Sequence, residues 1–350
     1  LLVNGLANAP NLEELDIDLD LLIKFDQYHS TMDAYARTTT QMVQLGSRMG
    51  STYELFGNNL AKCTKLKRLK VHNQYFPDAE GAQTHYSVGF LLALIPVLEQ
   101  GVIEEVTISL GNAPAPDTPN TERYNNAARD LFTAILKLQN VKEINLQFHL
   151  ASSPLLNTFL QVTEDMRQTM GTLPSSKVIE KFRLTCALHK IPEGMENPLP
   201  VPLSLAPMLS LLGKSSNLRE FVVLVPEGCW NCRSISELKN LLYAKPKLRR
   251  LYLSFHGVRD TSGRSLEYIL DYVQERENEE DNIIFVDGLD CSNTRFNEEE
   301  ILSNYYHVSG GKKCLAYDDD DEGWMFRAEG HIKRFDRKTV DMKVDLLLAA

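Results

Sequence analysis

The segment Cys229-Trp-Asn-Cys232 contains the pair of residues best suited to chemistry in this chain. A Cys-x-x-Cys pair can be oxidised reversibly, or it can supply half of a tetrahedral zinc site. Zinc would need two more ligands, and Cys291, His307 and Cys314 follow at no spacing typical of such a site. A thioredoxin-like pair would also open a helix in a different fold. We therefore favour a loop with two unreactive thiols, and a metal- or redox-dependent enzyme stays an alternative.

Two groups of carboxylates could bind cations or basic partners. Asp16, Asp18 and Asp20 alternate along the chain, which places them on one face of a strand and its exit. They lack the glycine and final Glu of a calcium loop, so we favour a solvated acidic face. The tract Asp318–Glu322 could dock a basic partner, but most charge runs are solvated, and we favour a polar turn.

No motif in the sequence supports catalysis. The eight histidines form no pair with the spacing of a metal-binding helix, and the residues around Ser309 do not match a nucleophile elbow. The segment Gly310-Gly-Lys-Lys313 lacks the spacing of a phosphate-binding loop. We expect a protein without catalytic residues, metal or cofactor.

The composition of the chain limits the classes of partner and the cellular compartment that we expect. The net charge of −10 disfavours general binding of nucleic acid, because phosphate contacts need a basic surface. The longest apolar run, Val88–Leu98, is far shorter than the roughly 18 residues of a membrane span. Six thinly spread cysteines favour a reducing, intracellular compartment, cytoplasmic or nuclear. The chain starts at Leu1 rather than Met, and we expect more chain before it.

The elements that position these residues follow from a repeat. The pattern apolar-x-x-apolar-x-apolar recurs, and each copy follows a stretch with helical periodicity. From Leu66 to Leu218 the copies are spaced by 37, 38, 38 and 39 residues, and a fixed period in this range is typical of a solenoid. The seven copies begin at Leu12, Leu66, Ile103, Val141, Ile179, Leu218 and Leu248. An eighth strand is expected at Asn282–Asp287, and the clearest helix at Arg123–Leu138.

The first copy, Asn11-Leu-Glu-Glu-Leu-Asp-Ile-Asp-Leu19, resembles the strand motif of leucine-rich-repeat proteins. The long helical connections resemble the ribonuclease-inhibitor-like branch, and the uneven repeats resemble those of fungal-type F-box proteins. The resemblance covers residues 1–290. It implies an α/β solenoid with parallel strands on the concave face and helices on the convex face. It also implies a protein-interaction module that, in an F-box protein, recruits substrates for ubiquitin ligation.

Several segments interrupt or end the repeats. Residues 21–53 form the largest insertion, and a helix is expected from about Thr38 to Leu60. The Pro-rich segments Asn112–Asn120 and Ile191–Pro202 are expected to be loops. Residues 291–350 are expected to cap the solenoid. Within this cap, Lys312–Tyr317 and Trp324–Arg327 are predicted to form a β-hairpin around the acidic tract, and Met342–Ala350 a short helix.

The residues between the buried positions of each copy should face a partner protein. Val222, Leu224 and Tyr252 would form an apolar patch beside Arg250, a grouping typical of contact hot spots. Alternatively, the C-terminal tail folds over this patch. The acidic first copy and the basic second copy could orient a partner or could pair with each other. The predicted binding residues are Arg68, Lys70, Arg183, Val222, Leu224, Arg250 and Tyr252. A structural subunit of a larger complex is the second hypothesis; the partner and the oligomeric state stay open.

Overall fold

A computed structural model describes most of the repeat region and parts of the tail. The described residues are 8–18, 53–73, 83–110, 119–148, 153–186, 204–225, 229–245, 248–254, 283–287, 305–309, 312–315, 323–328 and 331–336, together with Leu6 and Tyr272. The chain divides into two compact units. The first contains residues 1–203 and 214–217, and the second contains residues 204–213 and 218–350. The expected boundary at residue 290 lies inside the second unit and stays a prediction.

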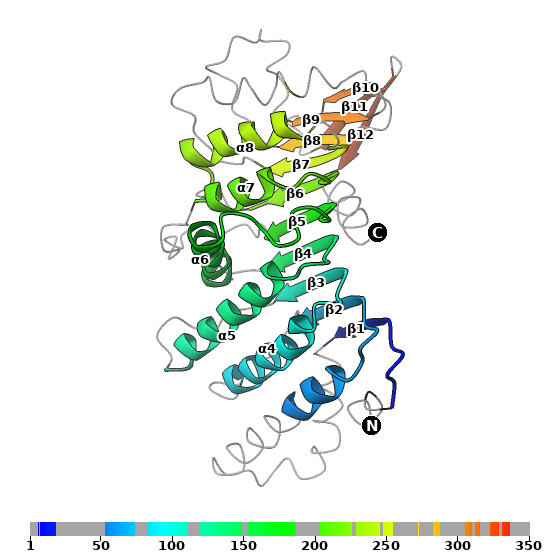
Figure 1. Ribbon diagram of the computed structural model, residues 1–350. Helices are drawn as coiled ribbons and strands as arrows, with labels where there is room; N and C mark the ends of the chain where they lie inside the picture. Colours follow the sequence, from blue (N-terminus) through cyan, green and yellow to red (C-terminus); the bar gives the residue numbers. More distant parts are fainter. Residues whose placement is uncertain are drawn as a thin grey trace. The chain divides into compact units, whose positions relative to one another are not determined.

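The first unit contains five parallel strands that follow one another in sequence order (Figure 1). They are β1 (Glu14–Asp18), β2 (Arg68–Asn73), β3 (Glu105–Leu110), β4 (Glu143–Phe148) and β5 (Lys181–Cys186). Their register aligns the repeated apolar positions. Ile17 is the Cα partner of Val71, which is followed across the sheet by Ile108, Leu146 and Leu184. All five of these side chains are buried, so this row of residues forms one layer of a core that the repeats share.

The helices of the first unit cover one face of these strands (Figure 1). They are the helix at residues 53–60, α4 (Gln83–Glu99), α5 (Pro119–Leu136) and α6 (Ser153–Thr169). Helix α5 confirms the one predicted at Arg123–Leu138, but it begins at Pro119, where proline's fixed φ suits a first helical residue. Of the predicted helix at 38–60, only residues 53–60 lie within the described ranges. Residues 112–118, 191–202 and 342–350, with their predicted loops and helix, lie outside them.

Successive repeats are joined by the same main-chain contact each time. The carbonyl of Glu13 accepts hydrogen bonds from the amides of Lys67 (2.9 Å) and Arg68 (3.0 Å). The carbonyls of Lys67, Glu104 and Lys142 each accept two consecutive amides of the next repeat in the same way. Side-chain amides add a second link: Asn140 Nδ2 donates to the carbonyl of Gly101 (2.8 Å). The 38-residue spacing is therefore the distance along the chain between equivalent hydrogen-bonding positions.

The second unit repeats the arrangement with fewer strands. Strands β6 (Glu220–Leu224), β7 (Arg250–Ser254) and β8 (Ile283–Asp287) are parallel neighbours, which confirms the strand predicted at 282–287. Helices α7 (Ala206–Gly213) and α8 (Cys232–Ala244) pack against each other. Both units are therefore α/β structures in which parallel strands alternate with helices.

The predicted hairpin of the C-terminal tail is wrong. Strand β10 (Lys312–Leu315) pairs with β9 (Tyr305–Ser309), and β11 (Gly323–Ala328) pairs with β12 (His331–Asp336). Strand β9 also pairs antiparallel with β8. Only two residues, Gly310-Gly311 and Glu329-Gly330, separate the strands of each hairpin. Two-residue connections that contain glycine favour hairpins more strongly than the longer acidic tract does, so each strand pairs with its nearer neighbour.

Gly57 tests the packing of two helices in the first unit, and Gly213, at the end of α7 in the second unit, is its control. A Cβ atom on Gly57 would lie 2.5 Å from the carbonyl oxygen of Ala93 in α4, whereas one on Gly213 would meet nothing within 4 Å. Gly57→Ala should lower the free energy of unfolding by about 1–3 kcal/mol, because the backbone of α4 must move. Gly213→Ala should leave it unchanged or raise it by up to about 1 kcal/mol.

Urea denaturation of the two variants, followed by circular dichroism, measures both effects. Hydrogen exchange should show that Gly57→Ala increases exchange in residues 53–60 and in α4 more than in α8. Equal midpoints for Gly57→Ala and the unchanged protein would contradict the close approach of these two helices.

Candidate functional site

The face of the first unit's strands that lies opposite the helices is the first candidate surface, and we call it the strand face. Side chains alternate along a strand, so the residues between the core positions lie here. The register arranges them in rows across the sheet. The three rows are Glu14, Arg68, Glu105, Glu143 and Lys181; Asp16, Lys70, Thr107, Asn145 and Arg183; and Asp18, His72, Ser109, Gln147 and Thr185.

The charges of β1 and β2 pair with each other. Arg68 donates from Nε (3.0 Å) and Nη2 (2.8 Å) to Oε2 of Glu14, and Lys70 Nζ lies 3.7 Å from the other carboxylate oxygen. Nε2 of His72 lies 3.3 Å from Oδ1 of Asp16. The hydrogen bonds and charge of Arg68 lower the pKa of Glu14 below its ordinary value, with a smaller contribution from Lys70. The acidic first copy and the basic second copy therefore pair with each other, and that they also orient a partner stays a prediction.

A second cluster on the strand face surrounds Glu143. This carboxylate lies 2.8 Å from Nζ of Lys181 and 3.7 Å from Nη1 of Arg183. The expectation that the side chain of Arg183 is solvated is wrong, because only 3% of the residue is exposed, whereas its role in binding stays a prediction. A guanidinium can be buried at low cost only beside a carboxylate, and Glu143 supplies one. Asn145 and Ser109 are also buried, so the strand face is open over β1 and β2 but not throughout β3–β5.

The apolar patch expected on the second unit is not open either. Val222 is 1% exposed and Tyr252 is 7% exposed, whereas Leu224 is half-buried. Val222 is the Cα partner of Tyr252, whose partner on β8 is Phe285. Apolar residues at adjacent ladder positions shield one another from water, which accounts for part of this burial. The covering tail proposed as the alternative lies largely outside the described residues.

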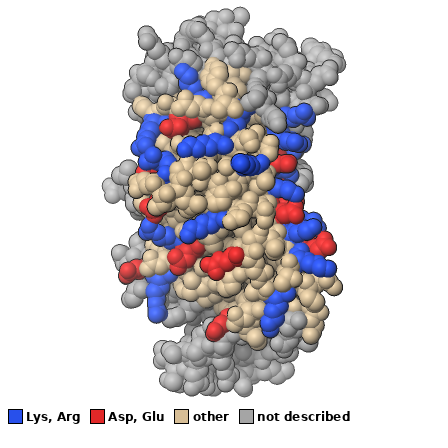
Figure 2. Space-filling model, in the orientation of Figure 1, with Lys and Arg blue, Asp and Glu red and all other residues tan. Residues whose placement is uncertain are grey.

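Arg250 is the one predicted binding residue of the second unit whose side chain is more than half exposed. Its Nη1 lies 3.4 Å from Oε2 of Glu220, a buried carboxylate on the neighbouring strand. The pair spans the same ladder position as Glu14 and Arg68 in the first unit. Oppositely charged residues on adjacent strands thus recur in both units. Figure 2 shows one face of the molecule, on which Lys and Arg are interspersed with Asp and Glu.

The Cys-x-x-Cys segment has a structural role in joining two helix starts. The carbonyl of buried Cys229 accepts hydrogen bonds from the amide of Leu205 (3.3 Å) and the hydroxyl of Ser234 (3.2 Å). Oδ1 of Asn231 caps α8 by accepting the amide of Ser234 (2.9 Å) and also accepts the hydroxyl of Ser204 (3.1 Å). The predicted loop is wrong in one respect, because Cys232 is the first residue of α8.

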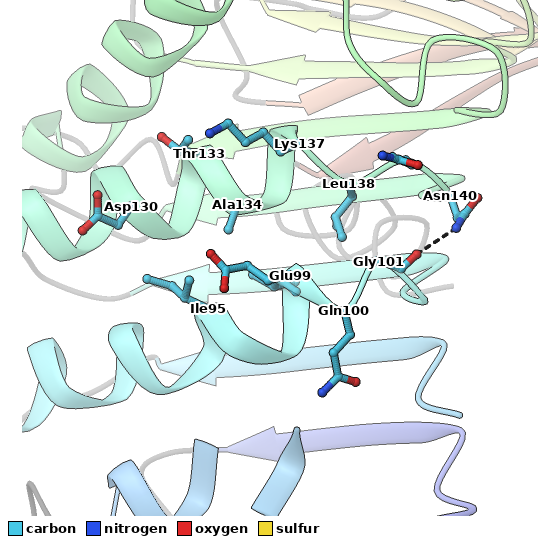
Figure 3. Close-up of a pocket in the computed structure, with 12 residues that line it drawn as sticks. Ile95, Glu99, Gln100, Gly101, Asp130, Thr133, Ala134, Lys137, Leu138 and Asn140 are labelled. Carbon is cyan, nitrogen blue, oxygen red and sulfur yellow. Dashed lines mark hydrogen bonds between the residues drawn. The ribbon is translucent and has the colours of Figure 1, made fainter. Parts of the chain in front are cut away.

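A groove between α4 and α5 was not expected from the sequence (Figure 3). It has a volume of about 710 Å³ and lies at the C-terminal ends of the two helices and the turns that follow. Ile95, Leu98, Ala134 and Leu138 supply its apolar lining. The remaining lining residues are Gly101 and the polar residues Glu99, Gln100, Asp130, Thr133, Lys137, Gln139 and Asn140. The one sequence feature that indicates such a groove is the apolar run Val88–Leu98. A helix that is apolar on all sides is normally covered by other protein on its outer face as well.

Metal binding and membrane insertion find no support in the described residues. Within those ranges, no three His, Cys, Asp or Glu side chains are placed to hold a metal ion. Asp20 of the acidic first copy, and the side chains of Asp18, His307 and Cys314, lie outside the described set. None of the helices that the structure describes has both the length and the apolar character needed to cross a membrane.

Thiol accessibility tests the structural role of the Cys-x-x-Cys segment. Cys232 is exposed, whereas Cys63, Cys186 and Cys229 are buried, and burial raises the pKa of Cys186 to about 11. A raised pKa lowers the thiolate fraction at neutral pH and therefore the reactivity. In the native protein, iodoacetamide should alkylate Cys232 at least roughly tenfold faster than these three, as measured by peptide mass spectrometry.

Denaturation in urea should make all four thiols react at similar rates. Native labelling of Cys229 as fast as that of Cys232, or stoichiometric zinc in the purified protein, would instead support the metal or redox alternative.

No protein-family model matches the chain, and a comparison with curated proteins gives no match.

Proposed function

We propose that this chain is a non-catalytic binding module that recognises a partner protein with the open part of its strand face, over β1 and β2. The repeat supports this proposal, because the helices and the aligned apolar rows leave the other side of these strands available. The observation that carries it is the cluster Glu14, Arg68 and Lys70. All three side chains are partly exposed, between 38% and 42%, on adjacent strands.

The chemistry of this cluster favours an acidic contact from the partner. Two cations share one carboxylate within the cluster, but Asp16 and Glu105 lie at the ladder positions next to Lys70 and Arg68. The positive charge offered to a partner is therefore that of Lys70 rather than that of the whole face. Lys70 is the looser of the two, at 3.7 Å from Glu14 compared with 2.8 Å for Arg68. Exposed ion pairs stabilise a fold by only about 0.2–1 kcal/mol, so exchanging such a contact for a partner's carboxylate costs little. Charges of this kind give an interface its orientation and its association rate.

The most concrete form of the proposal is an F-box-type adaptor whose leucine-rich-repeat solenoid selects substrates for ubiquitin ligation. The repeat length, the helical connections and the parallel register support a solenoid of this type. The ubiquitin-ligase role rests on the resemblance of the first copy and of the uneven repeats. A structural subunit fixed in a larger complex is the alternative.

Charge reversal on β2 tests the proposed surface. Lys70→Glu should reduce capture of the specific partner about tenfold or more, because it places two carboxylates beside the partner's acidic residue. Lys177→Glu, an exposed position outside the strand face, should leave capture unchanged. Quantitative mass spectrometry of proteins bound to the tagged full-length protein measures both.

Three outcomes separate the hypotheses. Loss of the same partners in both variants would show an effect of net charge rather than of this surface. Unchanged capture by Lys70→Glu would contradict the strand-face site. Recovery of ubiquitin-ligase subunits would support the adaptor form, and recovery of one fixed stoichiometric assembly would support the structural subunit.

A further inference from the structure

We propose that the groove between α4 and α5 is a second docking site, which takes an amphipathic helix of a partner protein with basic residues beside its apolar face. This inference concerns the helix side of the first unit and does not depend on the strand-face proposal. Three observations lead to it: the apolar outer face of α4, the adjoining groove, and two carboxylates at the groove that have no ion-pair partner in the part of the chain that the structure describes.

Helix α4 is apolar on both its inner and its outer side. Phe90, Leu94 and Val97 are buried against the rest of the unit, with at most 1% of each exposed. On the outer side Leu92 is 44% exposed, and Pro96 is exposed as well. A helix at the surface of a protein normally has a polar outer face, and one that is apolar all round is normally covered. The outer face of α4 is therefore suited to contact with another apolar surface.

The groove continues this apolar surface toward α5. Ile95 and Leu98 line it from α4, and Ala134 and Leu138 line it from α5 and the turn beyond. Its volume of about 710 Å³ suits a few large side chains. Exposed Leu92 lies one helical turn before Ile95, so the apolar strip is longer than the groove itself. An elongated strip beside a groove matches the way a helix docks with apolar residues on successive turns.

The charges beside the groove define which helix fits. Glu99 of α4 and Asp130 of α5 are both exposed, and neither has an ion-pair partner among the described residues. In Figure 3 they come from the two facing helices, with Ile95 and Ala134 near them. Lys137 extends toward Thr133 rather than toward Glu99.

A neighbouring carboxylate on the same side is neutralised. Asp165 of α6 forms an ion pair with Arg129 of α5. Lys137 of α5 also lines the groove, so its three charged lining residues carry a net charge of −1, with one carboxylate on each wall. A Lys or Arg on the incoming helix, placed between Glu99 and Asp130, would complement this charge.

A matched pair of synthetic peptides tests both parts of the inference. Each is a helix of about fifteen residues, roughly four turns, with leucines on one face. One peptide carries Arg beside the leucines and the other carries Glu at the same positions. Fluorescence anisotropy with the full chain should give a Kd at least about tenfold lower for the Arg peptide.

Variants locate the binding. The double variant Glu99→Lys with Asp130→Lys should reverse the preference in favour of the Glu peptide. Leu92→Glu should weaken binding of the Arg peptide by about tenfold or more, because it interrupts the apolar strip. The control Glu122→Lys also lies on α5 and changes the net charge by as much as either one of the two groove replacements does, but it is outside the groove. It should leave the preference unchanged.

The control is needed because the chain's net charge of −10 attracts any cationic peptide. If Glu122→Lys shifts the logarithm of the Kd ratio of the two peptides by half as much as the double variant does, the shift follows net charge alone, which would show general attraction and would overturn the proposal. Equal binding of the two peptides to the unchanged protein would also overturn it. A Leu92→Glu variant that converts a dimer to a monomer in analytical ultracentrifugation would identify a second copy as the occupant instead. Circular dichroism checks that each variant folds, and Lys70→Glu should bind the Arg peptide normally, which separates this site from the strand face.

Discussion

The register of the parallel strands is the constraint on which the rest of the first unit depends. Parallel neighbours cannot be joined by a tight turn, so each pair needs a crossover, which here is a helix. The paired amides on the carbonyls of Glu13, Lys67 and Glu104 fix where each crossover must return. Once that register is set, the apolar rows align and the residues between them are directed to the opposite face. A shift by one residue would exchange core and surface along a whole strand.

The strands could be predicted because their signal is local and repeated. Each predicted copy from Leu12 to Leu248 contains a described strand. The repeated pattern apolar-x-x-apolar-x-apolar predicts these strands because its apolar residues are the ones that form the core. Helix α5 was predictable for the same reason. The exposure of the residues between the core positions could not be predicted, because the burial of Arg183 in the first unit and of Tyr252 in the second depends on neighbours distant in sequence. The groove depends on the spacing of two helices, and a single segment carries no information on that spacing.

The charged residues of the first unit differ in what they leave for a partner. On the strand face, Arg68 and His72 have acidic neighbours on β1, and the lowered pKa of Glu14 reflects the attraction of Arg68. Beside the groove, Glu99 and Asp130 have no such neighbour in the described residues. Paired charges favour orientation over affinity, because a partner must replace an existing contact. Unpaired carboxylates next to apolar surface add attraction without that replacement, provided that the partner supplies a cation.

The layered architecture also bears on the choice between an interaction module and a structural subunit. In the first unit the strand face and the α4–α5 groove belong to opposite sides of one strand–helix layer (Figure 1). A partner on one side therefore does not block the other, and the aligned core between them keeps both surfaces rigid. The two surfaces proposed above would prefer opposite charges, which suits a chain that connects two different proteins. An adaptor needs that property, and a subunit fixed through a single interface does not.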